Sequence, residues 1–239
     1  AMDHSKLLVS MGGGMAVLSP TAEKWRQVTG NIILQGYGLS ETSPVATANP
    51  INSATFSGTI GVPMPSTEIA IIDDEGNEVA MGERGEIGVR GPQVMKGYWQ
   101  RAEATAEVMT DDGYFLTGDI GIMGDDGYVT IVDRKKNMIL VSGFNVYPTE
   151  VEEVMTGHPK IIECGVIGID NGESGEVPKI FVVRQDESLT KEEVLKYSQD
   201  NLTGYKRPRY VEFIDELPKS NVGKILHKDL REMEAKNKA

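Results

Sequence analysis

The sequence has almost no cysteine and no long apolar run, and each of these absences excludes a class of protein. Cys164 is the only cysteine among 239 residues, so no disulfide forms within the chain. No apolar run approaches the ~18 residues needed to span a bilayer, and the N-terminus lacks the apolar core of a signal peptide. We therefore expect a cytoplasmic protein.

Positive charge is also in short supply. The chain has 24 Lys and Arg against 36 Asp and Glu, which gives a formal net charge of -12. Such a chain repels a nucleic-acid backbone, so we expect no nucleic-acid partner. Two basic clusters, at 134–136 and at Lys206, Arg207 and Arg209, are candidates for holding a small anion, although a solvated face is the usual role of such clusters.

The residue pattern changes twice along the chain, which predicts a multi-domain α+β protein. Residues 1–57 have the pattern of the tail of an α/β layer. Residues 58–133 contain short apolar runs separated by turn residues, which predict a small antiparallel β-barrel subdomain. Residues 134–239 then predict a compact C-terminal α+β domain.

Local signals predict the individual elements. Pro148 stands where a first helical position is expected, and Thr190 with Glu193 forms a capping box. The expected helices cover 20–28, 148–155 and 190–202 and one begins at Lys228, and the expected strands cover 32–34, 164–169, 179–183 and 211–214.

Four short segments carry residue types suited to a nucleotide and a carboxylate. In the first segment, Gly36 and Gly38 flank Tyr37 and let the backbone approach a planar ligand on which the ring stacks. Ser40 offers a hydroxyl to a phosphate, and Glu41 offers a hard oxygen ligand to Mg²⁺. The alternative for this segment is a β-turn with a packing tyrosine.

The second and third segments suit a ribose and a hinge. Asp119 follows a tight turn, where its carboxylate either accepts hydrogen bonds from both ribose hydroxyls or caps the turn. Arg134 is a candidate for the same ribose or for a phosphate. Lys136 lies where the β pattern ends, which suggests a hinge, and Gly143 either permits close contact with a narrow ligand or forms a turn.

The fourth segment, residues 218–226, places Lys224 behind a glycine turn. A compact ammonium group on a flexible stem suits a carboxylate or phosphate undergoing reaction, whereas the alternative is a lysine that points to water. The segment is not a P-loop, because Pro218 occupies the first glycine position and Ile225 replaces the Ser or Thr that would hold Mg²⁺.

Taken together, these motifs resemble those of the adenylate-forming ligases, and more narrowly those of the bacterial long-chain fatty acid-CoA ligases. The segments that carry the resemblance are 35–42, 82–99, 112–139, 142–152 and 217–226. The resemblance implies that a fatty acid and MgATP give acyl-AMP and pyrophosphate, after which coenzyme A displaces AMP. ATP, the fatty acid and coenzyme A would be the small-molecule partners, with Mg²⁺ as the metal.

The resemblance also implies a role for each candidate residue. Lys224 would bridge the carboxylate and α-phosphate oxygens, which makes Lys224 and Glu41 the catalytic candidates. Lys136 would be the hinge of a mobile C-terminal lid. The nucleotide site would contain Gly13 and Gly14 beside the adenine, Gly36 and Gly38 around the stacking Tyr37, Ser40 at the α-phosphate, Glu41 on Mg²⁺, and Asp119 with Arg134 on the ribose, while Gly143 and Phe144 would line the pantetheine tunnel.

Several alternatives stay open at this point. The chain suits an aryl-CoA ligase, a luciferase-like enzyme, an amino-acid adenylating domain or a non-catalytic adenylate-binding module as well. The family's phosphate loop is absent, so we expect the chain by itself to be an inactive fragment. A homodimer and a peripheral contact with the inner membrane for fatty-acid uptake are also left open.

Overall fold

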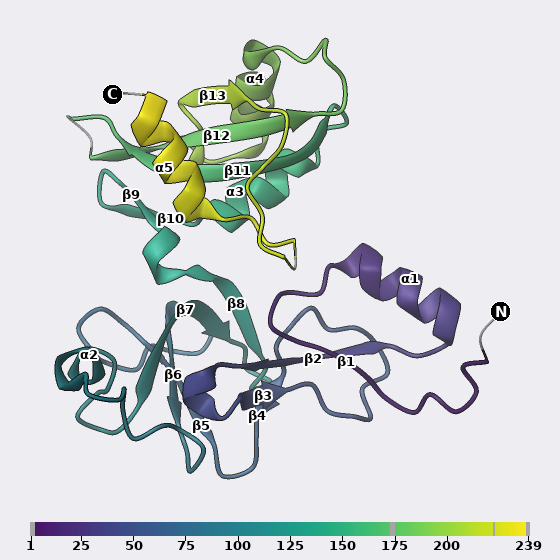
Figure 1. Cartoon of the computed structure of the whole chain (residues 1–239), viewed down its shortest axis with the longest axis vertical. Coiled ribbons are helices and arrows are strands. Elements are labelled where there is room, and N and C mark those ends of the chain that lie inside the picture. The colour runs from purple at the N-terminus through teal and green to yellow at the C-terminus, as the bar shows by residue number, and fades with distance from the viewer. Residues whose placement is uncertain (1–2, 173–174, 222, 238–239) are drawn as a thin grey trace. The chain divides into compact units, whose positions relative to one another are not determined.

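The computed structural model describes residues 3–172, 175–221 and 223–237. The chain forms two compact units, a first unit of Ala1–Ile131 and a second unit of Val132–Ala239 (Figure 1). Both units mix sheets with few helices, which confirms the predicted α+β class. The three-part division at 57/58 and 133/134 stays a prediction.

The first sheet of the first unit has the order β1-β2-β3-β4. Strands β1 and β2 are parallel because helix α1 carries the chain back between them, whereas β3 and β4 continue antiparallel. Pro20 lies in the first turn of α1, and Gly30 ends the helix in a left-handed conformation with φ of 78°. The elements are β1 (Ser10–Gly12), α1 (Ser19–Thr29), β2 (Ile33–Gly38), β3 (Val45–Ala48) and β4 (Val62–Pro63).

The second sheet of the first unit corrects the predicted β-barrel. In the described residues it is an open four-stranded sheet of order β5-β6-β7-β8, because the outer edge of β8 pairs with the segment before β4 instead of with β5. The amide of Ile60 donates to the carbonyl of Val129 over 2.9 Å, and Val129 donates to Gly61 over 2.9 Å. Because β5 and β8 do not pair with each other, the sheet does not close. Its elements are β5 (Glu68–Ile72), β6 (Arg84–Arg90), α2 (Ala102–Ala106), β7 (Phe115–Met123) and β8 (Val129–Arg134).

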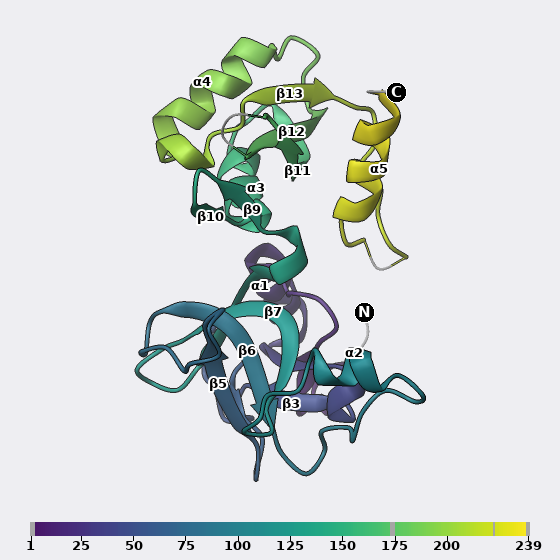
Figure 2. The same cartoon turned by 90° about the vertical axis from the view of Figure 1, so that its left-hand side faces the viewer.

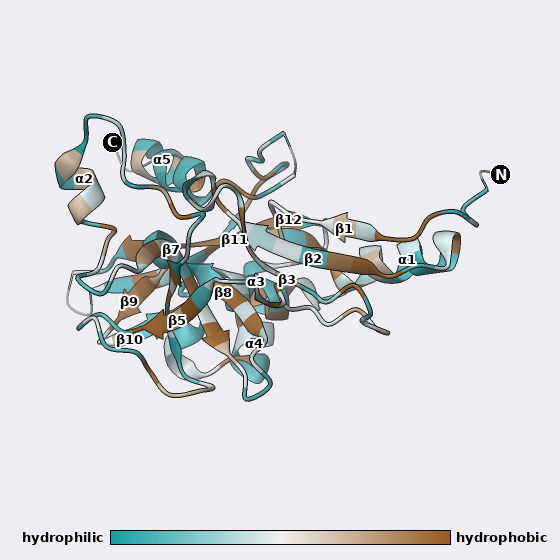
Figure 3. Cartoon of the chain, turned by 90° about the horizontal axis from the view of Figure 1, so that it is seen from below, coloured by the Kyte–Doolittle hydropathy of each residue, from teal (hydrophilic) through white to brown (hydrophobic). Residues whose placement is uncertain are grey.

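The core of the first unit lies where its two sheets meet. Side chains from both sheets form one buried cluster, to which the functional candidate Tyr37 also contributes its ring. The hydrophobic segments concentrate on the strands, as the brown stretches of β2 and β5 show (Figure 3). The buried members are Tyr37, Ala46, Ile60, Ile69, Ile71, Ile87, Val89 and Val129.

The second unit is built on a three-stranded sheet of order β11-β12-β13, with a β9-β10 hairpin before it. Strands β11 and β12 are antiparallel, and β13 joins β12 in parallel. Figure 2 shows α4 and α5 at different sides of this sheet. The elements are β9 (Ile139–Val141), β10 (Phe144–Val146), α3 (Pro148–Thr156), β11 (Ile161–Asp170), β12 (Glu176–Arg184), α4 (Lys191–Asn201), β13 (Tyr210–Phe213) and α5 (His227–Asn237).

The helix signals of the second unit are confirmed. The Thr190 side chain accepts a hydrogen bond from the Glu193 amide, and the Glu193 carboxylate accepts one from the Thr190 amide over 2.9 Å. Pro148 begins α3 as expected. None of the helices in the described ranges is long and apolar enough to cross a bilayer.

Cys164 provides a test of this packing. Its side chain is 1% exposed within β11, and burial, assisted by the nearby carboxylates of Glu152 and Glu163, raises the pKa of its thiol well above the usual range. Because the thiolate is the reactive form, we expect a disulfide reagent at pH 8 to leave the native chain unlabelled over an hour. One equivalent should react at once in guanidinium chloride, and rapid labelling without denaturant would contradict the packing of β11.

Candidate functional site

Two predicted site residues that lie far apart in the sequence meet in the first unit. The Tyr37 hydroxyl donates a hydrogen bond to Oδ2 of Asp119 over 2.7 Å, and the two side chains are 9% and 4% exposed. The phenol therefore fixes the rotamer of the Asp119 carboxylate. Strand β2 supplies Tyr37 and β7 supplies Asp119, so the contact joins the two sheets.

The turn before Asp119 is held from both sides. Gly118 has φ of 73°, a left-handed conformation that favours glycine. Its amide donates to the Glu86 carboxylate over 2.8 Å, and the Thr117 hydroxyl donates to the Ile87 carbonyl over 2.8 Å. The carboxylate of Asp119 thus stands on a rigid turn, which suits a group that must present fixed oxygens.

Two glycines of the predicted adenine pocket lie so close to neighbouring backbone that little or no room is left for a side chain. A Cβ atom on Gly38 would lie 1.7 Å from the Pro44 carbonyl oxygen, and a Cβ on Gly13 would lie 3.1 Å from the carbonyl oxygen of Gly36. Gly13 and Gly36 are therefore neighbours, as the parallel pairing of β1 with β2 requires. Gly13 also lines an apolar cavity of about 410 Å³ between β1 and α1.

Glu41 has a partner that the sequence analysis did not assign. The Tyr98 hydroxyl donates to Oε1 of Glu41 over 2.9 Å, and the Glu41 carbonyl accepts the amide of Met95 over 2.8 Å. Desolvation of the phenol, followed by this hydrogen bond, raises the pKa of Tyr98, so the hydroxyl keeps its proton and remains a donor. Glu41 and Ser40 share one short 3₁₀ turn, which places both beside Tyr37 in sequence.

The residues around Glu41 fit a Mg²⁺ ion that takes few of its ligands from the protein. No group of three or more His, Cys, Asp or Glu that could hold a metal occurs among the residues that the structure describes. Mg²⁺ usually takes one or two protein carboxylates and keeps water and substrate phosphates as its other ligands. A single carboxylate oriented by a tyrosine is compatible with that mode of binding.

The remaining candidates lie in the second unit, which begins at Val132 within β8. Arg134 ends β8, and its amide donates to the Asp133 carboxylate over 2.6 Å. Lys136 is exposed in a short 3₁₀ turn, Lys135–Asn137, between β8 and β9. A single turn between two strands can absorb a change of backbone torsion. The hinge at Lys136 stays a prediction.

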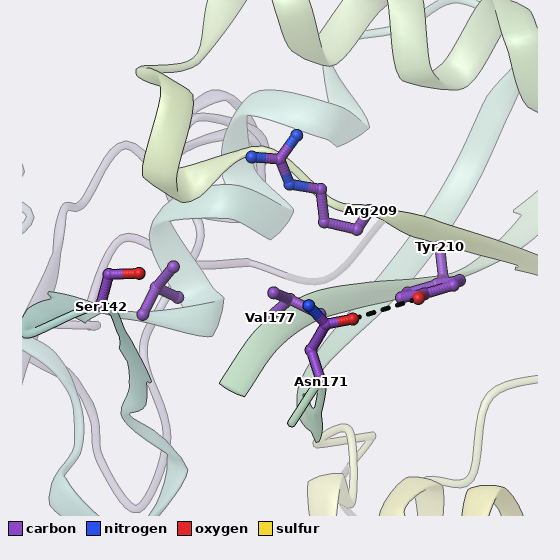
Figure 4. A pocket seen from close by; sticks show the side chains of 6 residues that line it. Ser142, Asn171, Val177, Arg209 and Tyr210 are labelled. Atoms are coloured by element: carbon purple, nitrogen blue, oxygen red, sulfur yellow. Dashed lines mark hydrogen bonds between the residues drawn. The ribbon is translucent and has the colours of Figure 1, made fainter. Parts of the chain in front are cut away.

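The hairpin of β9 and β10 exposes its tip. Gly143 has φ of 86°, and no atom lies within 4 Å of where its Cβ would be. Phe144 is 55% exposed and stacks on Tyr205, with ring centroids 4.7 Å apart and an interplanar angle of 17°. Beside this tip lies an open cavity of about 380 Å³, lined by Val141, Ser142, Asn171, Val177, Arg209 and Tyr210 (Figure 4).

The structure separates the members of the predicted basic cluster. Lys206 pairs with the Glu150 carboxylate over 2.9 Å, and Arg207 donates to the carbonyls of Leu202 and Gln199. In contrast, the Arg209 side chain lines the cavity of Figure 4, and no side-chain partner for it occurs in the described ranges. Two of the three basic groups are therefore structural.

Lys224 stands on a narrow hairpin loop that leads into α5. The Ser220 amide donates to the Lys224 carbonyl over 2.9 Å, and the Lys224 amide donates back to the Ser220 hydroxyl over 3.2 Å. Lys219 and Ile225 form an isolated bridge across the loop. The Lys224 side chain is exposed, and its ammonium contacts no carboxylate among the residues described.

The structure shows where the predicted site residues lie, and two pairs of them are in contact. In the first unit, Tyr37 contacts Asp119 and Gly13 lies next to Gly36. Each of the other candidates lies within one of the two units. The structure does not test the ligand assigned to any of them, so these roles stay predictions. Tyr98 was missed, although it lies in the motif at 82–99 and a tyrosine next to a glycine could have been noted there.

Two family models match most of the chain. The model of the AMP-binding enzyme matches residues 1–99, and the model of the AMP-binding enzyme C-terminal domain matches residues 150–224. The first match contains Tyr37, Glu41 and Tyr98, and the second contains Lys224. The matched order is the one that the motifs predict.

Curated relatives extend the similarity over nearly the whole chain. The chain is 57% identical over 235 residues to the long-chain-fatty-acid-CoA ligase of Yersinia pestis, which covers 98% of this chain and 42% of that protein. It is 44% identical to the corresponding ligase of Bacillus subtilis over 98% of this chain, and 44% identical to a probable 4-coumarate-CoA ligase of Dictyostelium discoideum over 84% of it. The chain thus spans well under half the length of these relatives.

Solved structures agree with this result. ATP-bound MatB from Rhodopseudomonas palustris is 35% identical and superimposes with a TM-score of 0.87 over 94% of this chain and 45% of that one. The o-succinylbenzoate-CoA synthetase of Bacillus subtilis, in complex with its acyl-adenylate intermediate, gives a TM-score of 0.80 at 33% identity. From its family models, its relatives and its fold, the chain belongs to the AMP-binding enzyme family.

Proposed function

We propose that this chain forms part of an ATP-dependent long-chain fatty acid-CoA ligase of the AMP-forming type. The observation that carries the proposal is the hydrogen bond between Tyr37 and Asp119, which joins the predicted adenine and ribose residues across 82 positions of sequence. The 57% identity to a ligase of this name supports the long-chain assignment over the 4-coumarate ligase, at 44%. A non-catalytic module is less favoured, because binding AMP alone needs neither Lys224 nor Glu41.

In the first half-reaction, a carboxylate oxygen of the fatty acid attacks the α-phosphorus of ATP. The new bond joins that oxygen to phosphorus, the bond from the α-phosphorus to the bridging oxygen breaks, and pyrophosphate leaves with the electron pair. Two anions must approach each other, so a placed cation lowers the barrier as charge moves onto the bridging oxygen. The exposed ammonium of Lys224 is the group that we assign to this task.

The nucleotide would be held by residues of the first unit, with Arg134 contributing from the second. Tyr37 would offer its ring to adenine, Asp119 would accept the ribose hydroxyls, and Ser40 would donate to the α-phosphate. Mg²⁺, when bound through Glu41, would neutralise phosphate charge. Tyr98 would then orient the Glu41 carboxylate by its hydrogen bond.

In the second half-reaction, the sulfur of coenzyme A attacks the acyl carbon of the adenylate. The carbon-sulfur bond forms, the bond from the acyl carbon to the phosphate oxygen breaks, AMP leaves and the thiol proton passes to water. The thiol must arrive where Lys224 stood, so the C-terminal lid would turn at Lys136 and bring Gly143 and Phe144 to the pantetheine arm. Cytoplasmic location, peripheral membrane contact and a homodimer remain predictions of this proposal.

Lys224 is tested in the full-length protein that contains this chain. Replacing Lys224 by Ala should lower fatty-acid-dependent pyrophosphate release by 100-fold or more, on the order expected for removing a group that stabilises transition-state charge. The exposed Lys228, whose side chain is 84% exposed in α5, gives the matched control Lys228→Ala, which should retain release. Equal rates in both variants would remove Lys224 from the mechanism.

Tyr37 is tested by separating its ring from its hydroxyl. Tyr37→Phe should raise the KM for ATP by about 2- to 5-fold, because Asp119 loses the hydrogen bond that orients its carboxylate. Tyr37→Leu should raise it by about 10-fold or more, because aromatic stacking is lost as well. Melting temperatures must be compared, because the ring also packs in the core of the first unit. Tyr114→Phe, at a tyrosine that packs on Arg90, is the control. A KM for ATP that is unchanged in Tyr37→Leu would argue against the adenine site.

The hinge is tested by fixing its backbone. Lys136→Pro locks φ of the turn, so it should spare pyrophosphate release but slow the transfer of the acyl group from preformed acyl-AMP to coenzyme A. Lys136→Ala keeps the torsional freedom and removes the same exposed side chain, so both half-reactions should survive in it. Equal loss of the two half-reactions in Lys136→Pro would refute the hinge.

A further inference from the structure

The first residue of α5 is a buried histidine, in a helix that is polar overall. His227 is 8% exposed and follows Lys224 by three residues. Its Nε2 lies 2.7 Å from Oε1 of Glu152, a residue of α3 whose side chain is 12% exposed. The start of the helix behind Lys224 is therefore fastened to α3.

The Glu152 carboxylate also holds β11, an outer strand of the three-stranded sheet. The same oxygen, Oε1, accepts the amide of Val166 in β11 over 2.8 Å. One carboxylate thus joins α3, β11 and α5. Removing such a shared acceptor leaves two buried donors without a partner, which costs more than an ordinary exposed bond.

The ring of His227 faces the hinge segment on its other side. Its Nδ1 lies 3.5 Å from Nδ2 of Asn137, the residue after Lys136. The Asn137 amide nitrogen also lies 3.4 Å from Oδ1 of Asp133. An amide nitrogen only donates, so Nδ1 accepts, and Nε2 carries the proton that it donates to Glu152. In this arrangement each contact has one donor and one acceptor.

Further contacts tie α5 and α3 to the same segment. The Arg231 guanidinium of α5 donates to the Lys136 carbonyl over 3.1 Å. The Thr149 amide of α3 donates to Oδ2 of Asp133 over 2.9 Å. Asn137, on the C-terminal side of Lys136, is 6% exposed and is held to α5, whereas the contacts of Asp133 cross Lys136 and must open when the hinge turns.

The opposite end of the Lys224 loop is anchored on β11 as well. Lys219 pairs with the Glu163 carboxylate over 2.6 Å. A Cβ on Gly165 would lie 2.7 Å from Leu230, 3.2 Å from Leu217 and 3.4 Å from Ile225, so these three side chains pack directly over that glycine. The two ends of the loop, at Lys219 and Ile225, are therefore fastened to this strand.

From these contacts we propose that Glu152, His227 and Asn137 are positioning residues that fix Lys224 to the hinge. Rotation at Lys136 then carries the lysine as part of one rigid body, so that the lid returns it to the same place in each cycle. The inference rests on the proposed adenylation function. It assigns a use to a buried histidine and carboxylate that neither half-reaction employs directly.

The experiment compares the two half-reactions in the full-length protein. His227→Phe keeps a ring but loses both hydrogen bonds, so kcat for pyrophosphate release should fall about 10-fold or more, as expected when a catalytic group is misplaced. The KM values for ATP and fatty acid should stay within twofold. The transfer from preformed acyl-AMP to coenzyme A should stay near the wild-type rate, because that step does not use Lys224.

Two further variants separate positioning from general stability. His227→Gln can still donate to Glu152 and should recover part of the lost rate. Val194→Ala removes methyl groups from the fully buried core around α4 without touching the network, and it serves as a control for lower stability. If the histidine is merely structural, both half-reactions should fall together in His227→Phe as they do in Val194→Ala.

A double-mutant comparison provides the decisive result. In a Lys224→Ala background, His227→Phe should cause no further loss of pyrophosphate release, since the group that it positions is already gone. Losses that multiply, an unchanged single variant or an equal fall of both half-reactions would each overturn the inference. A wild-type protein without fatty-acid-dependent release would instead contradict the proposed function itself. If His227→Phe does not fold, the same comparison is made with His227→Asn, which loses the donor to Glu152, against His227→Gln.

Discussion

The tight packing over Gly165 is the constraint on which the second unit depends. Because this position of β11 has no side chain, Leu217, Ile225 and Leu230 approach the strand closely and seat the Lys224 loop and α5 on it. Glu163 before this glycine pairs with Lys219, and the Val166 amide directly after it donates to the Glu152 carboxylate. Any larger residue at 165 would displace the loop, the helix and the network at once.

The elements that the sequence predicted well are those set by local chemistry. The Thr190 capping box, Pro148 at the start of α3 and Gly30 at the end of α1 depend on neighbours within four residues, and the structure contains all three. The β-barrel was wrong because closure depends on a pairing between distant strands. The edge of β8 binds Gly61, about 70 residues earlier, and no local pattern reveals such a partner.

The same distinction applies to the candidate site. Motif spacing pointed to Tyr37 and Asp119, yet the bond between them depends on two sheets meeting. The sequence alone could not show which residues of the basic cluster are free to bind an anion. Lys206 pairs with Glu150 and Arg207 donates to backbone carbonyls, whereas Arg209 lines a cavity. Glu152 and His227 were missed because they are 75 residues apart and each looks ordinary alone.

Charge distribution explains why Lys224 in particular is available for chemistry. Its basic neighbours are engaged: Lys219 with Glu163, Lys228 with Glu232, and Arg231 with the Lys136 carbonyl. The Lys224 ammonium has no carboxylate partner in the described ranges, and its side chain is exposed, so water solvates it at little cost. An ammonium that forms no pair beforehand needs no bond broken when an anion arrives, and its attraction grows as the closing site excludes water.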